Sequence, residues 1–186
     1  GAISGAGSLT QAGTGTLTLT GANAYSGTTT IAVGGSLRVG AGGTSGSLGT
    51  GAVVNAGSLV FNRSDHVTLA NPLTFVTTIT GGTPPPDLCA GCTWDMSFTT
   101  VVGGLVQAGS GMLDITGNYS QGTTTISAGT LRFSGGGTTF RPGTITNDGV
   151  LQMNRCDAVM LGRVTGTGRL EILSGEVSFA SSTFSS

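Results

Sequence analysis

The stretch LTQAGTGTLTLTG at residues 9–21 returns as LVQAGSGMLDITG at residues 105–117. Further along, GAVVNAGSLVFNR at residues 51–63 returns as GTITNDGVLQMNR at residues 143–155. Apolar positions stay apolar and glycines stay glycine, as expected where every copy of a position has the same neighbours in a stack of repeated units. The two copies span residues 7–69 and 104–161. This internal repeat predicts a solenoid.

Within each copy the apolar residues alternate with polar ones. Leu37-Arg38-Val39 and Leu131-Arg132-Phe133 are examples. This is the period of a β-strand, and no segment of ten or more residues has the helical spacing. We therefore expect an all-β fold with essentially no α-helix. The residues expected to point into the core are Leu17, Leu19, Ile31, Leu37, Leu59, Phe61, Leu113, Ile115, Ile126, Leu131, Phe133, Leu151 and Met153.

Short, evenly spaced strands occur in sandwiches, propellers and β-helices. Aromatic residues make up only 5% of the chain, with a single Trp, which disfavours sandwich cores and propeller blades. Strands recur about every 20 residues, a solenoid period. The expected architecture is a single parallel β-helix domain over residues 1–186, with roughly nine coils.

The composition excludes several classes of protein. Only 8% of the 186 residues are charged, there is no Lys, and the net charge is −1. A nucleic-acid-binding module needs clustered Lys and Arg, so this class is excluded. No apolar run reaches the ~20 residues that span a bilayer as a helix.

The first copy, from GTGTLTLTG at residues 13–21 to YSGTTTI at residues 25–31, resembles the passenger-associated repeat of bacterial autotransporters. The family commonly has Lys where Gln11 and Gln107 stand. The resemblance implies a right-handed parallel β-helix that is exported through the outer membrane of a Gram-negative cell. The signal peptide and the translocating barrel of the family are not recognised in the chain, so we expect a fragment of a longer passenger. The resemblance carries no catalytic motif.

Residues 81–100 have no counterpart in the second copy and are expected to form an inserted loop. The loop contains Pro84, Pro85 and Pro86, which cannot donate to a β-ladder. It also contains Trp94, an aromatic type enriched at binding hot spots, followed by Asp95. These five residues are our candidate binding site.

Two of the three cysteines, Cys89 and Cys92, lie in the same loop. In an exported protein this spacing favours a local disulfide. A zinc half-site would need a second pair of ligands, and a redox site would need a βαβ context. We expect no metal and no cofactor. Cys156 is expected to be a small buried or corner thiol.

The remaining candidates for chemistry have simpler structural explanations. His66 corresponds to Ala158 in the other copy, so we expect it to be exposed on a strand. Asp65 and Asp157 are repeat equivalents, predicted to lie four to five coils apart and to cap turns, which excludes them as a glycosidase dyad. Glu171 and Glu176 are interpreted as outward charges that protect strand edges.

These observations lead to a functional hypothesis. The protein is expected to be a non-enzymatic, secreted or surface-exposed passenger that acts as an adhesin or structural stalk. Its expected partners are a host-cell or matrix surface, or other copies of the chain, and not nucleic acid, and the fragment itself is not expected to span a membrane. Two alternatives remain open: a carbohydrate-active β-helix enzyme such as a lyase or depolymerase, and a subunit of a self-assembling extracellular filament.

Overall fold

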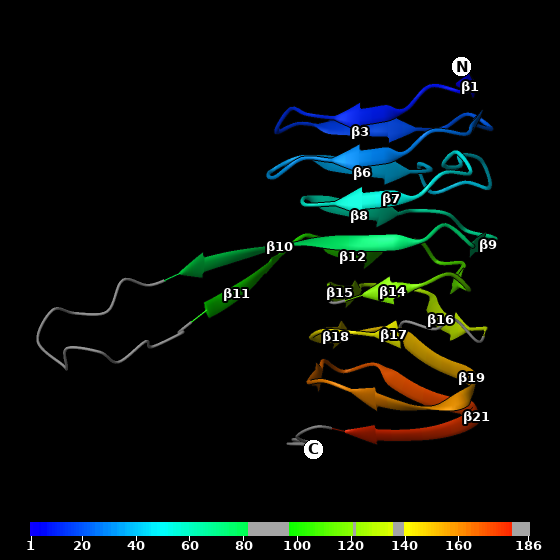
Figure 1. Ribbon diagram of the computed structural model, residues 1–186. Coiled ribbons are helices and arrows are strands. Elements are labelled where there is room, and N and C mark those ends of the chain that lie inside the picture. Colours follow the sequence, from blue (N-terminus) through cyan, green and yellow to red (C-terminus); the bar gives the residue numbers. More distant parts are fainter. Residues whose placement is uncertain (82–96, 121, 136–139, 180–186) are drawn as a thin grey trace, which may run out of the picture.

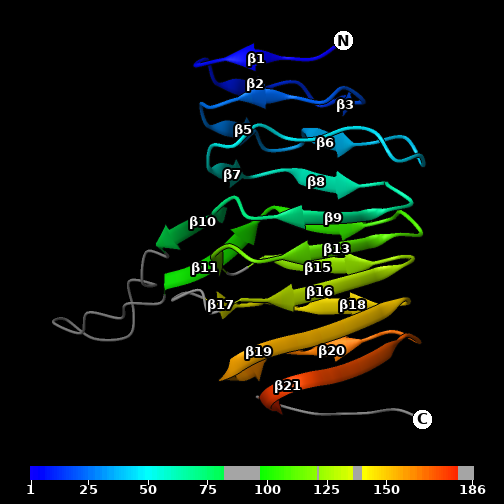
Figure 2. The ribbon, with the colours of Figure 1, turned by 90° about the vertical axis from the view of Figure 1, so that its right-hand side faces the viewer.

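The computed structural model describes residues 1–81, 97–120, 122–135 and 140–179, and in them every regular element is a strand. The strands stack as successive rungs from β1 near the N-terminus to β21 near the C-terminus (Figures 1 and 2). Between successive turns the pairing is parallel, as in a β-solenoid. The predicted parallel, all-β fold is confirmed.

Three sheets form the sides of the stack. The first sheet contains β2 (Leu9–Gln11), β5 (Thr29–Ile31), β7 (Val53–Asn55), β10 (Leu73–Gly81), β14 (Tyr119–Ser120) and β17 (Phe140–Arg141). The second contains β3 (Thr16–Leu19), β6 (Ser36–Val39), β8 (Ser58–Phe61), β12 (Gly104–Gln107), β15 (Thr123–Ile126), β18 (Ile145–Asn147) and β20 (Val164–Thr165). The third contains β9 (His66–Leu69), β13 (Met112–Ile115), β16 (Thr130–Ser134), β19 (Val150–Leu161) and β21 (Arg169–Phe179). A short separate sheet pairs β1 (Ser4–Gly5) with β4 (Ala24–Tyr25), and β11 (Ser97–Val102) pairs with β10.

The second sheet has seven strands, so the solenoid has about seven turns rather than nine. The estimate of nine divided the whole chain by the length of one coil. It was too high because residues 76–81 and 97–102 pair with each other outside the stack and add no turn to it.

The interior is built from the alternating apolar residues. In the second sheet Leu17, Leu37, Leu59 and Leu105 are successive register partners and form one inward column. All the residues predicted for the core are buried except Leu17, which is partly buried near the N-terminal end of the stack. The strand period therefore identified the core correctly.

The two copies of the repeat do not lie on the same sides of the solenoid. β2 and β3 lie in the first and second sheets, whereas their counterparts β12 and β13 lie in the second and third. Three successive pairings in the second sheet lead from β3 through β6 and β8 to β12. Corresponding residues of the two copies are therefore separated by three full turns plus one side of the solenoid. The four to five coils predicted from residue counts were too many.

Candidate functional site

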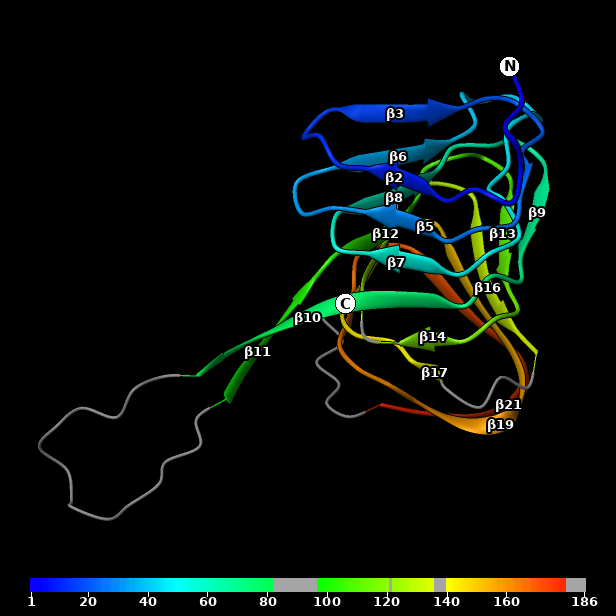
Figure 3. The same ribbon diagram turned by 45° about the horizontal axis from the view of Figure 1, so that its top comes forward.

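The inserted segment begins as a β-arm. Residues 73–75 of β10 lie in the first sheet between β7 and β14. From Val76 onward β10 leaves the sheet and pairs antiparallel with β11, in register from Val76 opposite Val102 to Gly81 opposite Ser97. The arm formed by these two strands projects from the side of the stack (Figures 1 and 3).

The base of the arm is anchored in the core by Phe75, which is buried. The ring of Phe75 makes an edge-to-face contact with Tyr119, with ring centroids 5.3 Å apart, and Tyr119 contacts Phe133 in the same way at 5.0 Å. The chain re-enters the solenoid at Gly103, whose φ of 115° is a left-handed value that favours glycine. A Cβ atom at Gly103 would lie 2.4 Å from the carbonyl oxygen of Asn55. The arm therefore leaves from a packed and specific base.

The predicted binding residues Pro84, Pro85, Pro86, Trp94 and Asp95 lie outside the described residues, as do Cys89 and Cys92. Their roles, including the disulfide, stay predictions. The antiparallel pair that leads to and from this segment runs from Val76 to Gly81 and from Ser97 to Val102.

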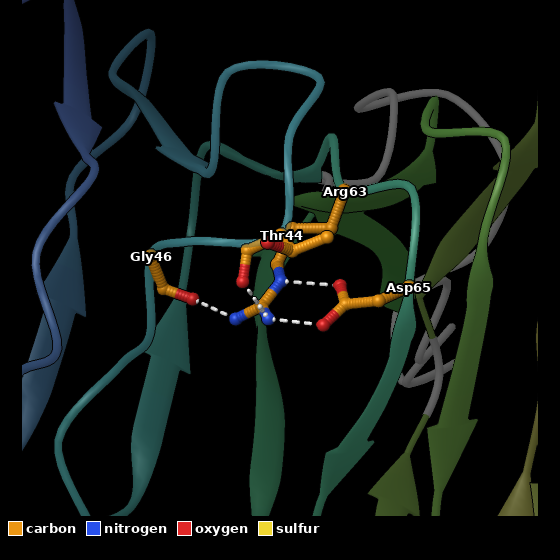
Figure 4. Close-up of polar contacts among 4 residues, drawn as sticks. All are labelled: Thr44, Gly46, Arg63 and Asp65. Atoms are coloured by element: carbon orange, nitrogen blue, oxygen red, sulfur yellow. Dashed lines mark hydrogen bonds and ion pairs between the residues drawn. The ribbon is translucent and has the colours of Figure 1, made fainter.

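An arginine clamp occupies the corner that follows the second sheet in the upper half of the stack. Arg63 donates from Nε and Nη2 to the two carboxylate oxygens of Asp65, at 2.8 and 2.6 Å. The same guanidinium donates to the backbone carbonyls of Gly46 and Thr44 in the preceding turn (Figure 4). These hydrogen bonds from Arg63 hold the pKa of Asp65 below the ordinary aspartate value.

The second copy of the repeat has the same arginine–aspartate pair. Arg155 donates from Nε and Nη2 to the carboxylate of Asp157, at 2.9 and 2.8 Å, and its guanidinium carbon lies 4.5 Å from the ring centroid of Phe140. The hydrogen bonds from Arg155 lower the pKa of Asp157. Both aspartates were predicted to cap turns through their own backbone. A hydrogen bond from its own backbone does lower the pKa of each carboxylate, but the largest effect comes from the arginine two residues earlier, a pairing that the shared Arg-x-Asp spacing indicates.

A second charged cluster lies on the outer surface of the third sheet, where Asp114 faces Arg132 across one rung. Asp114 also accepts a hydrogen bond of 2.6 Å from the hydroxyl of Ser134, and Nε2 of His66 lies 3.8 Å from its carboxylate. Burial alone would raise the pKa of Asp114, but the hydrogen bonds from Arg132 and Ser134 outweigh it and lower the pKa. This cluster was not predicted, because Asp114 replaces Thr18 of the first copy.

The cluster offers little reactive surface. Only 4% of Asp114 is exposed. His66 is exposed, as predicted. Cys156 is also exposed, which rules out the buried thiol and leaves the predicted alternative of a thiol at a corner. Glu171 accepts from Arg169 and Gln152, whereas Glu176 is exposed on β21. Within the described ranges, no three His, Cys, Asp or Glu side chains gather as a metal site.

A small cavity of about 300 Å³ lies between the turn containing Ser47 and Leu48 and the strand β9. Its lining is mostly apolar and includes Phe61 and Leu69, and Asn71 supplies an amide. That amide donates to the carbonyls of Gly49 and Gly51, so it joins the two rungs. The amide of Asn71 is therefore already bonded to the protein, and the hydroxyls of Ser47, Thr50 and Thr68 are the other polar side-chain groups of the lining.

The model of the passenger-associated-transport-repeat matches the chain twice, at residues 9–39 and 105–133. Comparisons with curated proteins and with solved structures gave no significant match. Among the described residues no helix has the length and apolar character needed to cross a bilayer. The chain thus carries two passenger-associated-transport-repeats within a parallel β-solenoid of about seven turns, a combination consistent with the passenger of an autotransporter.

Proposed function

We propose that this chain is a non-enzymatic passenger displayed outside the cell, where the solenoid serves as a stalk and the inserted arm as the adhesive element. The observation that carries the proposal is the β-arm. The repeat needs only a turn between the first and second sheets, and at this one level β10 and β11 project from the stack instead. Binding segments commonly project from a rigid scaffold in this way.

Five of the six described carboxylates, all except the exposed Glu176, also favour a non-enzymatic role. Asp65, Asp114, Asp157 and Glu171 each bind an arginine, and Asp148 accepts hydrogen bonds from Thr167. A glycosidase needs two carboxylates that face the same substrate bond. These groups are instead held by partners within the protein.

The test replaces residues 82–96 by a Gly/Ser linker of equal length, which removes Trp94 and the prolines but keeps both strands of the arm. Beads coated with the purified chain are then incubated with cultured epithelial cells and with fibronectin-coated or collagen-coated plates. We expect adhesion to be lost while the melting temperature is unchanged. Val33→Ser is the matched control, because Val33 is an exposed apolar residue at a different turn. Full adhesion by the linker variant would overturn the proposal.

A further inference from the structure

Among the described strands, each strand of the arm has a paired neighbour on one side only. The pairing of β10 with β7 ends at Phe75 and its pairing with β14 ends at Thr74. Over residues 76–81, β11 is the partner of β10 among the described strands, and the reverse holds for residues 97–102. Each strand therefore has one edge whose backbone N–H and C=O groups are available to a further strand.

The composition of these strands favours such pairing. VTTITG at residues 76–81 and SFTTVV at residues 97–102 contain no charged residue and no proline, and nine of these twelve residues are Val, Ile or Thr. Exposed edges in natural proteins are normally protected by charges or prolines. The strand β21, at the end of the third sheet, shows that protection, because it contains Arg169, Glu171 and Glu176. The arm lacks it.

We propose that the arm is a self-recognition element, which pairs edge to edge with the arm of a second copy of this chain. An isolated two-stranded hairpin is only marginally stable in water, so additional strands would stabilise it. Around a two-fold axis, identical antiparallel strands match in length. In full register residues 77 and 78 of β10 stand opposite residues 80 and 79, and residues 98 and 99 of β11 stand opposite residues 101 and 100, so the central pairs consist of β-branched or aromatic residues without like-charge repulsion. The arm projects from the stack, which leaves room for the second solenoid (Figure 3).

A contact of this size gives weak association in solution, since small interfaces are transient. On a cell surface many arms are presented together, and multivalency then increases the overall strength of attachment between cells. Association between arms is independent of binding to a host surface.

The test is sedimentation equilibrium of the purified chain over a wide range of concentrations. We expect concentration-dependent dimers for the wild type and monomers after residues 77–101 are replaced by Asn-Gly, a turn that closes the pair Val76–Val102. Two lysine variants are compared, one for each strand of the arm. The first is Thr78→Lys with Thr80→Lys in β10, and the second is Ser97→Lys with Thr99→Lys in β11. Like charges brought together should weaken dimerisation by at least about tenfold in the variant whose strand forms the contact.

The matched control is Thr123→Lys with Thr125→Lys, which places two lysines at the same spacing in β15, a strand paired on both sides. The control should dimerise like the wild type. The chain with residues 82–96 replaced should also still dimerise even if it no longer adheres to cells, which separates this proposal from the adhesive role. A monomeric wild type, dimers of the arm-shortened chain, or two lysine variants that both dimerise normally would overturn the proposal.

Discussion

Gln11 and Gln107 make the same two side-chain hydrogen bonds, although Gln11 lies in the first sheet and Gln107 in the second. Gln11 donates from Nε2 to the carbonyls of Gly13 and Gly15, at 3.1 and 2.7 Å. Gln107 donates to the carbonyls of Gly109 and Gly111, at 3.0 and 3.1 Å. The repeat therefore specifies a local turn together with the glutamine side chain that donates to its carbonyls. The same turn occurs at two different corners of the solenoid.

The two glutamines give a matched pair of substitutions. Gln107 is buried, so Gln107→Leu leaves the carbonyls of Gly109 and Gly111 without a donor at a place that water does not reach. This substitution should lower the free energy of unfolding by about 1–3 kcal/mol. Gln11 is partly exposed, so Gln11→Leu should cost less. Urea unfolding of both variants measures the difference, and equal costs would show that the turn does not depend on the side-chain donor.

Glycines are stacked at the corners for a steric reason. A Cβ atom at Gly149 would lie 2.6 Å from the carbonyl oxygen of Gly129, whereas a Cβ atom at Gly13 would have no atom within 4 Å. We expect Gly149→Ala to lower the free energy of unfolding by about 1–3 kcal/mol, as overpacking does. Gly13→Ala should stay within about 0.5 kcal/mol of the wild type. Denaturant unfolding tests both, and a tolerated Gly149→Ala would contradict the close approach of the rungs.

The sequence predicted the class of fold and the core because both depend on local patterns. The alternation in Leu37-Arg38-Val39 is set by the pleat of one strand, and any parallel stack buries the same residues. The number of turns depends instead on where the chain leaves the stack. Residues 76–80 are VTTIT and contain the same Val, Ile and Thr as the strands of the solenoid, so their composition does not mark Val76 as the point of departure.

The contacts of the charged residues were predicted less well. The Arg-x-Asp spacing at Arg63 and Arg155 was visible in both copies. Whether the aspartate side chain bonds mainly its own backbone or the arginine depends on the backbone geometry of the corner, which the spacing does not give. Asp114 and Arg132 are 18 residues apart in the chain, and only the register of β13 with β16 brings them together. That register could not be predicted before the number of residues per turn was known.

The clamp at Arg63 should hold the turn at residues 40–46 in place. Arg63→Lys keeps the charge but loses the planar guanidinium that bonds the Asp65 carboxylate and two carbonyls together. We expect faster hydrogen exchange and faster proteolysis within residues 40–46, with little change in the melting temperature. Arg38→Lys is the control, since Arg38 lies in the middle of β6. Unchanged exchange in residues 40–46 would show that the clamp does not order this turn.

The contact between Asp114 and Arg132 should make stability depend on pH. Because the folded protein lowers the pKa of Asp114, the charged carboxylate stabilises the fold above the ordinary aspartate pKa of about 3.9, and this contribution is lost as the pH falls below that value. Asp114→Asn should therefore cost about 1–3 kcal/mol near neutral pH, the range for hydrogen bonds to charged groups. The unfolding free energies of the wild type and the variant should converge in acid.

In an Arg132→Gln background, Asp114→Asn should lower the free energy of unfolding by less at neutral pH, because the main partner of Asp114 is already gone. Urea unfolding across the pH range measures both effects, and a cost that is the same at every pH would show that the charge of Asp114 contributes nothing to stability.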